Sequence, residues 1–130
     1  MRTREDLEAY LSRSGLPYEE VETDMWVVHD TSSTENIVVI LAGPLVVFRL
    51  KILETSQIKD APKLHEKLLE FNAQEMVHGA YGIIDGAVVL TCSLRLENLD
   101  YNEFQGTIDD FSLALTNHFE TLSAFRADAA

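Results

Sequence analysis

The hydrophobic positions near the start of the chain have the spacing of a helix. Apolar side chains recur three and four residues apart, at Leu7, Tyr10 and Leu11. Thr3 precedes them and Asp6 follows Thr3 by three residues, which is the spacing of a capping box. Gly15 is a typical stop signal beyond the last apolar position. The pattern therefore predicts a first helix between Thr3 and Gly15.

The spacing then changes to alternation, which predicts a single strand with one buried face. Apolar and acidic side chains alternate over residues 18–28. The face expected to be buried carries Val21, Thr23, Met25 and Val27. Trp26 and Val28 fall on the opposite face together with the acids, which we expect to be exposed to solvent. We call such apolar side chains on a face expected to be exposed the apolar surplus.

Two more strands are predicted around a Gly-Pro pair. Residues 30–36 are polar and predict a loop. Residues 37–41 and 45–53 are rich in β-branched side chains and flank the Gly-Pro pair, as in an antiparallel meander. The even positions of the later run form a continuous apolar face, made by Val46, Phe48, Leu50 and Ile52. The odd positions are mixed and comprise Leu45, Val47, Arg49, Lys51 and Leu53.

A hairpin is predicted around Asp85 and Gly86, the strongest turn signal in the chain. Residues 76–84 and 87–96 flank this pair. A two-residue turn pairs Ile84 with Ala87, and the register that follows places Val89 opposite the core side.

Two helices complete the pattern. One begins at Asp60 with Pro62 in its first turn, where a missing N–H group costs nothing. Its apolar stripe consists of Leu64, Leu68 and Phe71. The last helix begins at Asp100, with Glu103 three residues later. Its stripe recurs at spacings of four and three, at Phe104, Ile108, Phe111, Leu115, His118, Leu122 and Phe125.

The predicted order is α-β-β-β-α-β-β-α. We expect an α+β fold in which a five-stranded antiparallel sheet packs with helices. A chain of 130 residues is the size of one domain, so we expect a single domain over residues 1–130.

Three stretches carry a resemblance to a known family. They are the helix KLHEKLLEFN at 63–72, the hairpin HGAYGIIDGAVVL at 78–90 and the segment LRLENL at 94–99. In this order they resemble the type III secretion chaperone fold, and in particular the YbjN-like family of bacterial putative sensory-transduction regulators. The resemblance implies a small, acidic, dimeric cytoplasmic protein that binds other proteins and has no enzymatic activity.

The charge of the chain narrows the classes of partner. Ten Lys and Arg against 22 Asp and Glu give a formal net charge of −12. Such a charge repels phosphate backbones and anionic membrane surfaces, so we expect neither nucleic acid nor membrane as a partner. The basic residues are also unevenly spread, because residues 14–48 and 97–125 contain neither Lys nor Arg.

The sequence features that report on compartment agree with a cytoplasmic protein. No apolar segment typical of a signal peptide follows Met1, and no run is long enough to span a membrane. The single cysteine, Cys92, lies in an apolar run. It cannot form an internal disulfide, and we interpret it as a buried, unreactive thiol.

No residue pattern predicts catalysis, a metal site or a cofactor. The four histidines lack the spacing of zinc ligands, and we interpret His118 on the last apolar stripe as a partly buried histidine with satisfied nitrogens. The adjacent carboxylates Asp109 and Asp110 point to different faces of a helix and cannot share a proton as a catalytic dyad does, so we interpret them as solvated surface.

The apolar surplus is the most informative functional feature. Exposed apolar patches of several hundred Å² mark interfaces. We therefore expect a protein-binding adaptor or chaperone-like homodimer with an unidentified protein client. The candidate dimer or client interface comprises Leu64, Leu68, Phe71, Trp26, Val28, Val47 and Val89.

Two alternatives remain open at this stage. The helix bearing Leu64, Leu68 and Phe71 can itself cover part of the surplus face, in which case these residues belong to the core. The chain can also be a small-molecule-binding or catalytic domain that uses the sheet face.

Overall fold

The computed structural model describes residues 2–29, 36–76 and 78–127. Most of the loop predicted at residues 30–36 thus lies outside the described residues. The elements, in chain order, are α1 (Arg4–Arg13), β1 (Tyr18–Glu22), β2 (Met25–His29), β3 (Asn36–Ala42), β4 (Leu45–Glu54), the 3-10 turn η1 (Thr55–Gln57), α2 (Ala61–Gln74), β5 (Ala80–Ile84), β6 (Ala87–Arg95) and α3 (Tyr101–Ser123).

The sheet has six strands among the described residues, in the order β1-β2-β3-β4-β6-β5, and the prediction of five is wrong. The segment predicted as one strand is a hairpin, because Asp24 has φ 63° and turns the chain back on itself. Aspartate tolerates this left-handed backbone better than most residues do. All neighbouring pairs are antiparallel, so the α+β class is confirmed.

The same turn reverses the faces expected for this segment. Trp26 and Val28 lie in the core, opposite Val39 and Ile37 of β3. Met25 and Val27 are only partly buried. The expected assignment of faces is therefore wrong, because it carried one alternation across a turn.

The predicted helix ends agree closely with the structure. Thr3 and Asp6 form the capping box of α1, and Asp100 accepts a hydrogen bond from the backbone N–H of Glu103 at the start of α3. Asp60 is the N-cap residue of α2 but differs in detail. Its side chain makes no cap hydrogen bond, and its backbone carbonyl accepts from Leu64 instead.

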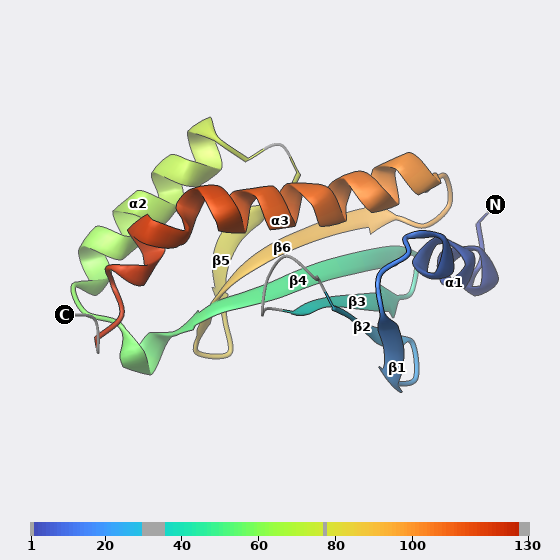
Figure 1. Ribbon diagram of the computed structural model, residues 1–130, viewed down its shortest axis with the longest axis horizontal. Coiled ribbons are helices and arrows are strands. Elements are labelled where there is room, and N and C mark those ends of the chain that lie inside the picture. Colours follow the sequence, from blue (N-terminus) through green and yellow to red (C-terminus); the bar gives the residue numbers. More distant parts are fainter. Residues whose placement is uncertain (1, 30–35, 77, 128–130) are drawn as a thin grey trace.

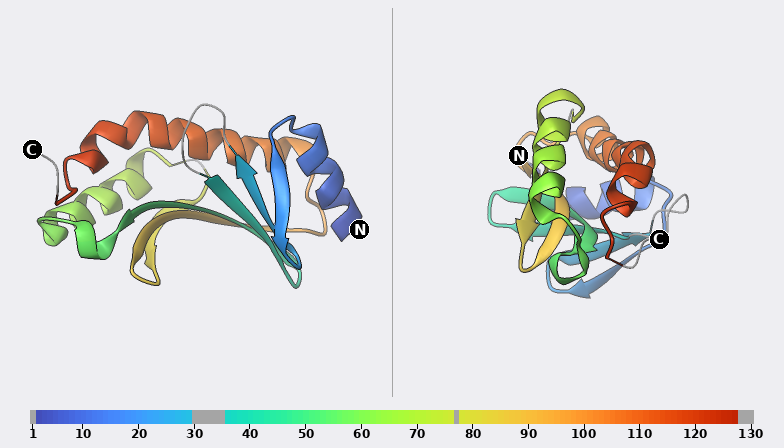
Figure 2. Two further views of the ribbon diagram at one scale, coloured as in Figure 1. Left: turned by 60° about the horizontal axis from the view of Figure 1, so that its bottom comes forward. Right: turned by 90° about the vertical axis from the view of Figure 1, so that its left-hand side faces the viewer.

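The helices share one side of the sheet (Figures 1 and 2). α2 and α3 run along this side, and α1 packs at the end near β1. The largest fully buried side chains include Trp26, Phe48, Phe104 and Phe111. The rings of Phe48 on β4 and Phe104 on α3 lie 5.6 Å apart between centroids, so the core lies between the sheet and α3.

The hairpin of β5 and β6 has the predicted register. Ile84 pairs with Ala87 and Tyr81 with Leu90. β5 begins at Ala80, later than predicted, and Gly79 just before it has φ 81°. Asn72 of α2 bonds both the N–H and the carbonyl of Tyr81, and thereby satisfies backbone groups at the outer edge of β5.

Candidate functional site

The first candidate surface is the side of the sheet that no described helix covers, which we call the outer face (Figure 2). The strand registers show which side chains share it. One row across the strands is Met25, Ile40, Val47 and Ser93, and the next is Val27, Val38, Arg49, Thr91 and Ala80. Val89 lies opposite Lys51 in a further row. The centre of the outer face is therefore largely apolar. Arg49 and Lys51 also lie on it, Lys51 pairs with Glu54, and Glu19 of β1 continues the row of Val27.

Arg49 sits in the middle of the outer face and is incompletely paired. Its Nε atom is buried and has no hydrogen-bond partner among the described residues. A buried donor without a partner is unfavourable, and most such groups in proteins are satisfied. An acceptor on a molecule covering this face would satisfy it.

The structure divides the seven expected interface residues between two places. Val47 and Val89 lie on the outer face, shielded by neighbouring side chains. The other five belong to the helix side of the sheet, where packing within the chain accounts for their burial; Phe71 is partly buried and the rest fully. They are Leu64, Leu68, Phe71, Trp26 and Val28. Among the described residues, six other large hydrophobic side chains on helices and edge strands are exposed, namely Leu69, Leu113, Phe119, Tyr18, Val21 and Ile83.

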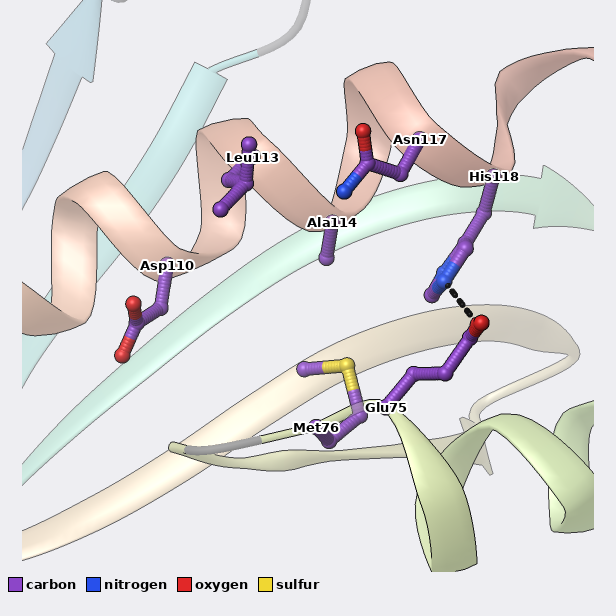
Figure 3. A pocket seen from close by; sticks show the side chains of 7 residues that line it. All are labelled: Glu75, Met76, Asp110, Leu113, Ala114, Asn117 and His118. Atoms are coloured by element: carbon purple, nitrogen blue, oxygen red, sulfur yellow. Dashed lines mark hydrogen bonds and ion pairs between the residues drawn. The ribbon is translucent and has the colours of Figure 1, made fainter.

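The second candidate is a pocket between the C-terminal end of α2 and the middle of α3, which we call the α2–α3 pocket (Figure 3). It has a volume of about 260 Å³. Its lining comprises Glu75, Met76, Asp110, Leu113, Ala114, Asn117 and His118. Asp110 stands at one end, and Glu75 with His118 at the other. The pocket thus combines two carboxylates with apolar side chains.

His118 is held at one end of the pocket by three contacts. Its Nε2 lies 2.7 Å from the Glu75 carboxylate and its Nδ1 lies 2.6 Å from the Tyr81 hydroxyl. Because an ionised carboxylate only accepts, Nε2 carries the proton and Nδ1 accepts from Tyr81. The Phe71 ring stacks on the imidazole at 3.7 Å between centroids. The prediction that both nitrogens of His118 are satisfied is confirmed, and its burial, at 4% exposure, is more complete than expected.

Asp110 is oriented from outside the pocket by a second histidine. Its Oδ2 bonds His78 Nδ1, and its side chain is only 27% exposed. The interpretation of Asp110 as solvated surface is therefore wrong, whereas Asp109 beside it is exposed. The sequence carried no signal of this pairing, and its one indirect signal concerned His118 and Glu75. A histidine on an apolar stripe needs polar partners, but local spacing does not say which acids supply them.

The order carboxylate, imidazole, hydroxyl along Glu75, His118 and Tyr81 is also that of a catalytic triad. Here the hydroxyl belongs to a buried phenol. Burial, and secondarily the charge of Glu75, raise the pKa of Tyr81 well above its usual value. A hydroxyl that resists ionisation is a poor nucleophile, so we interpret the chain of bonds as a link joining α2 and β5 to α3.

Cys92 is buried on β6, as predicted. Burial raises the pKa of its thiol, and a hydrogen bond involving Thr107 only partly opposes this shift. A thiol with a raised pKa holds little thiolate at neutral pH, and thiolate is the reactive form.

Two further observations concern possible metal ligands and membrane spans. Within residues 2–29, 36–76 and 78–127, no cluster of three or more His, Cys, Asp or Glu side chains is arranged to hold a metal ion. No helix of this part of the chain is long and apolar enough to cross a membrane.

Three solved structures are similar to this fold. YbjN, a putative transcription regulator from E. coli, has a TM-score of 0.65 at 14% identity, over 92% of this chain and 93% of its own. A chain of the ExoU-SpcU complex of the Pseudomonas aeruginosa type III secretion system has a TM-score of 0.65 at 16% identity, and the match covers 85% of this chain and 93% of that one. A chain of the ExsC-ExsE complex has a TM-score of 0.67 at 16% identity, and the match covers 100% of both chains.

No curated protein sequence matches the chain. The structural matches show a type III secretion chaperone-like fold of the YbjN type. The CesT_Tir_1 family, a type III secretion chaperone family, matches residues 1–128, and the chain belongs to it.

Proposed function

We propose that the protein is a non-enzymatic, chaperone-like binding protein that acts as a homodimer and holds a protein client on its outer face. The observation that carries the proposal is the apolar outer face, which no described helix covers. The family and the two chaperone complexes among the similar structures support the same class of function.

The composition of the outer face indicates how a client binds. Partly buried apolar residues, including Val38 and Ile40, offer area that a client can remove from water. Arg49 offers a buried Nε that lacks an acceptor among the described residues, and a client backbone carbonyl can provide one. The net charge of −12 favours clients that also carry basic side chains.

The proposed homodimer requires a second surface. The residues expected on α2, Leu64 and Leu68, are buried in the chain, so their replacement would test folding rather than assembly. Leu69 on the same helix is 69% exposed. We place the contact between the two copies on this exposed side of α2, away from the outer face.

The absence of enzymatic activity is part of the proposal. Burial raises the pKa of two nucleophile-type groups of the core, the hydroxyl of Tyr81 and the thiol of Cys92. The buried hydroxyl of Thr107 donates to the Glu103 carbonyl. The helix side of the sheet is filled by aromatic and aliphatic side chains of α3, including Phe104 and Phe111. This packing supports a binding function on the opposite side.

Client binding is tested with a displayed library of random short peptides. We expect the protein to enrich peptides that combine apolar residues with Lys or Arg and are poor in Asp and Glu. The affinity of an enriched peptide, measured by fluorescence anisotropy, falls at least about tenfold in Ile40→Lys, because burying an unpaired charge costs more than 1.4 kcal/mol, which is tenfold in affinity.

The matched control for this experiment is Phe119→Lys. Phe119 is 57% exposed and lies on α3, on the other side of the sheet. The control binds the peptide as the wild type does. Val38→Lys serves as a second variant, and circular dichroism checks the fold of each. Equal binding by the wild type and by both folded outer-face variants would place the client elsewhere and overturn the proposal.

The homodimer is tested by light scattering after size exclusion. We expect a mass near twice the 14.6 kDa of one chain. Leu69→Glu shifts the mass toward the monomer, because it removes the large exposed apolar side chain of α2 and adds negative charge between two acidic chains. The control is Val21→Glu on β1, a 46% exposed position at the other end of the molecule. A wild type that stays monomeric at high micromolar concentration rules out the dimer.

A further inference from the structure

We propose that the α2–α3 pocket binds a long cationic side chain of the client, best an arginine. This inference rests on the proposed function, because it assigns the pocket to a residue of the bound client. The pocket would be a specificity site, separate from the outer face, that recognises one side chain of the client.

The size of the pocket selects a small ligand group. Its volume is about 260 Å³. Sites for drug-sized ligands and cofactors occupy roughly 300–1,000 Å³. The α2–α3 pocket lies below that range, so a single side chain suits it better than a cofactor does. Leu113 at its rim is 59% exposed, so the pocket opens to solvent and a client residue can enter from the surface.

The chemistry of the lining selects a cation on an apolar stem. The carboxylates of Glu75 and Asp110 favour a positive group and repel an anion. Met76, Leu113 and Ala114 provide apolar contacts for the methylene groups of such a side chain. No cluster of metal-ligating side chains occurs among the described residues, so an organic cation fits the site rather than a metal ion.

The surroundings of the pocket reinforce this selection. The sequence has neither Lys nor Arg in residues 68–94 or 96–125, which include the whole of α3. The groups that hold the two carboxylates are histidines, His118 for Glu75 and His78 for Asp110. Each histidine bonds one carboxylate oxygen, and a carboxylate has a second oxygen that can accept a ligand donor.

The two histidine contacts also orient the carboxylates before a ligand arrives. His118 is buried and fixed by Tyr81 and by stacking on Phe71. A site whose groups are already ordered loses less entropy when a ligand binds. Arginine suits such a site best, because its planar guanidinium carries five donors in a fork that matches carboxylates, whereas lysine offers a point charge.

The test uses N-acetyl-arginine methylamide as the probe and follows methyl NMR signals of the wild-type protein. We expect saturable shifts for the methyl groups of Met76, Leu113 and Ala114, with weak affinity because one side chain is bound. The lysine analogue binds more weakly. The citrulline analogue keeps the shape of arginine without its charge, and we expect it to cause no saturable shift at these methyl groups.

Two conservative variants and one matched control assign the binding to the carboxylates. Asp110→Asn and Glu75→Gln each weaken arginine binding roughly tenfold, as expected for the loss of a charge-assisted hydrogen bond. The amide oxygen in Glu75→Gln still accepts from His118, which preserves the buried contact. Asp109→Asn makes the same change at the neighbouring exposed residue and leaves binding unchanged.

The outcomes separate this inference from the proposed function. Citrulline binding equal to arginine binding, or equal weakening by Asp109→Asn and Asp110→Asn, overturns the pocket assignment while peptide capture on the outer face still stands. If arginine binds as expected but outer-face variants capture peptides normally, the assignment of the client to the outer face fails instead. Shifts confined to methyl groups outside the pocket also refute the pocket assignment.

Discussion

Gly79 shows how one residue without a side chain sets the distance between two parts of the chain. A Cβ atom at this position would lie 2.6 Å from the carbonyl oxygen of Thr91 and 3.0 Å from the ring of Phe111. Its φ of 81° is also in the left-handed region. Glycines within a strand pattern often mark such a close approach of another backbone. Here the approach joins the start of β5 to β6 and α3.

The replacement Gly79→Ala is expected to destabilise the protein by at least about 2 kcal/mol. Overpacking alone costs about 1–3 kcal/mol, and left-handed backbone costs about 1–2 kcal/mol for a residue with a Cβ. Urea unfolding monitored by circular dichroism measures the change.

Gly82 on β5 is the matched control for this replacement. A Cβ there meets no atom within 4 Å. Alanine in a strand is favoured over glycine by roughly 0.5–1 kcal/mol, so Gly82→Ala is neutral or stabilising. Similar losses in both variants would mean that the close approach at Gly79 does not constrain the fold.

At the scale of elements, Arg4 ties α1 to the hairpin of β1 and β2. Its guanidinium bonds Asp24 at 2.7 Å and Glu20 at 2.5 Å, and it lies 5.0 Å from the centre of the Trp26 ring. The hydrogen bonds to Asp24 and Glu20 raise the pKa of Arg4, and the bond from Arg4 lowers the pKa of Glu20. These exposed contacts orient the hairpin against α1, although the energy of exposed ion pairs is small.

The elements that the sequence predicted well are those with local signals. The ends of α1 and α3 follow from capping residues, and the register of β5 with β6 follows from Asp85 and Gly86. The turn at Asp24 lacks both glycine and proline, so the alternation of residues 18–28 continued through it unmarked. That one omission accounts for both the missing strand and the reversed faces of Trp26 and Val28.

The candidate sites were harder to predict because they depend on distant contacts. His118 meets residues 43 and 37 positions away, Glu75 and Tyr81. The outer face depends on which side of the sheet the helices occupy. An alternating pattern indicates two faces, and it marked Val47 and Val89 as surplus, but it does not say which face is covered. Only the packing of α2 and α3 decides this.

At the scale of the whole molecule, the net charge of −12 acts on every association of the protein. Two copies that approach each other repel, and a basic client is attracted. Both effects are screened by salt, since the Debye length falls from about 30 Å at 0.01 M to about 3 Å at 1 M. The two proposed associations should therefore respond to salt in opposite directions.

Raising the NaCl concentration is expected to strengthen the homodimer and to weaken the binding of basic peptides. Screening removes the repulsion between two chains of formal charge −12 and leaves the contact at the exposed side of α2, including Leu69, largely unchanged. The attraction between the acidic chain and an arginine-containing peptide is screened at the same time.

Sedimentation equilibrium gives the dissociation constant of the dimer, and fluorescence anisotropy gives that of the peptide complex in the same buffers. A peptide with citrulline in place of arginine is the control, because its loss of affinity with salt should be smaller. A dimer that dissociates as salt rises would show that the two copies are held by ion pairs, which contradicts a contact centred on Leu69.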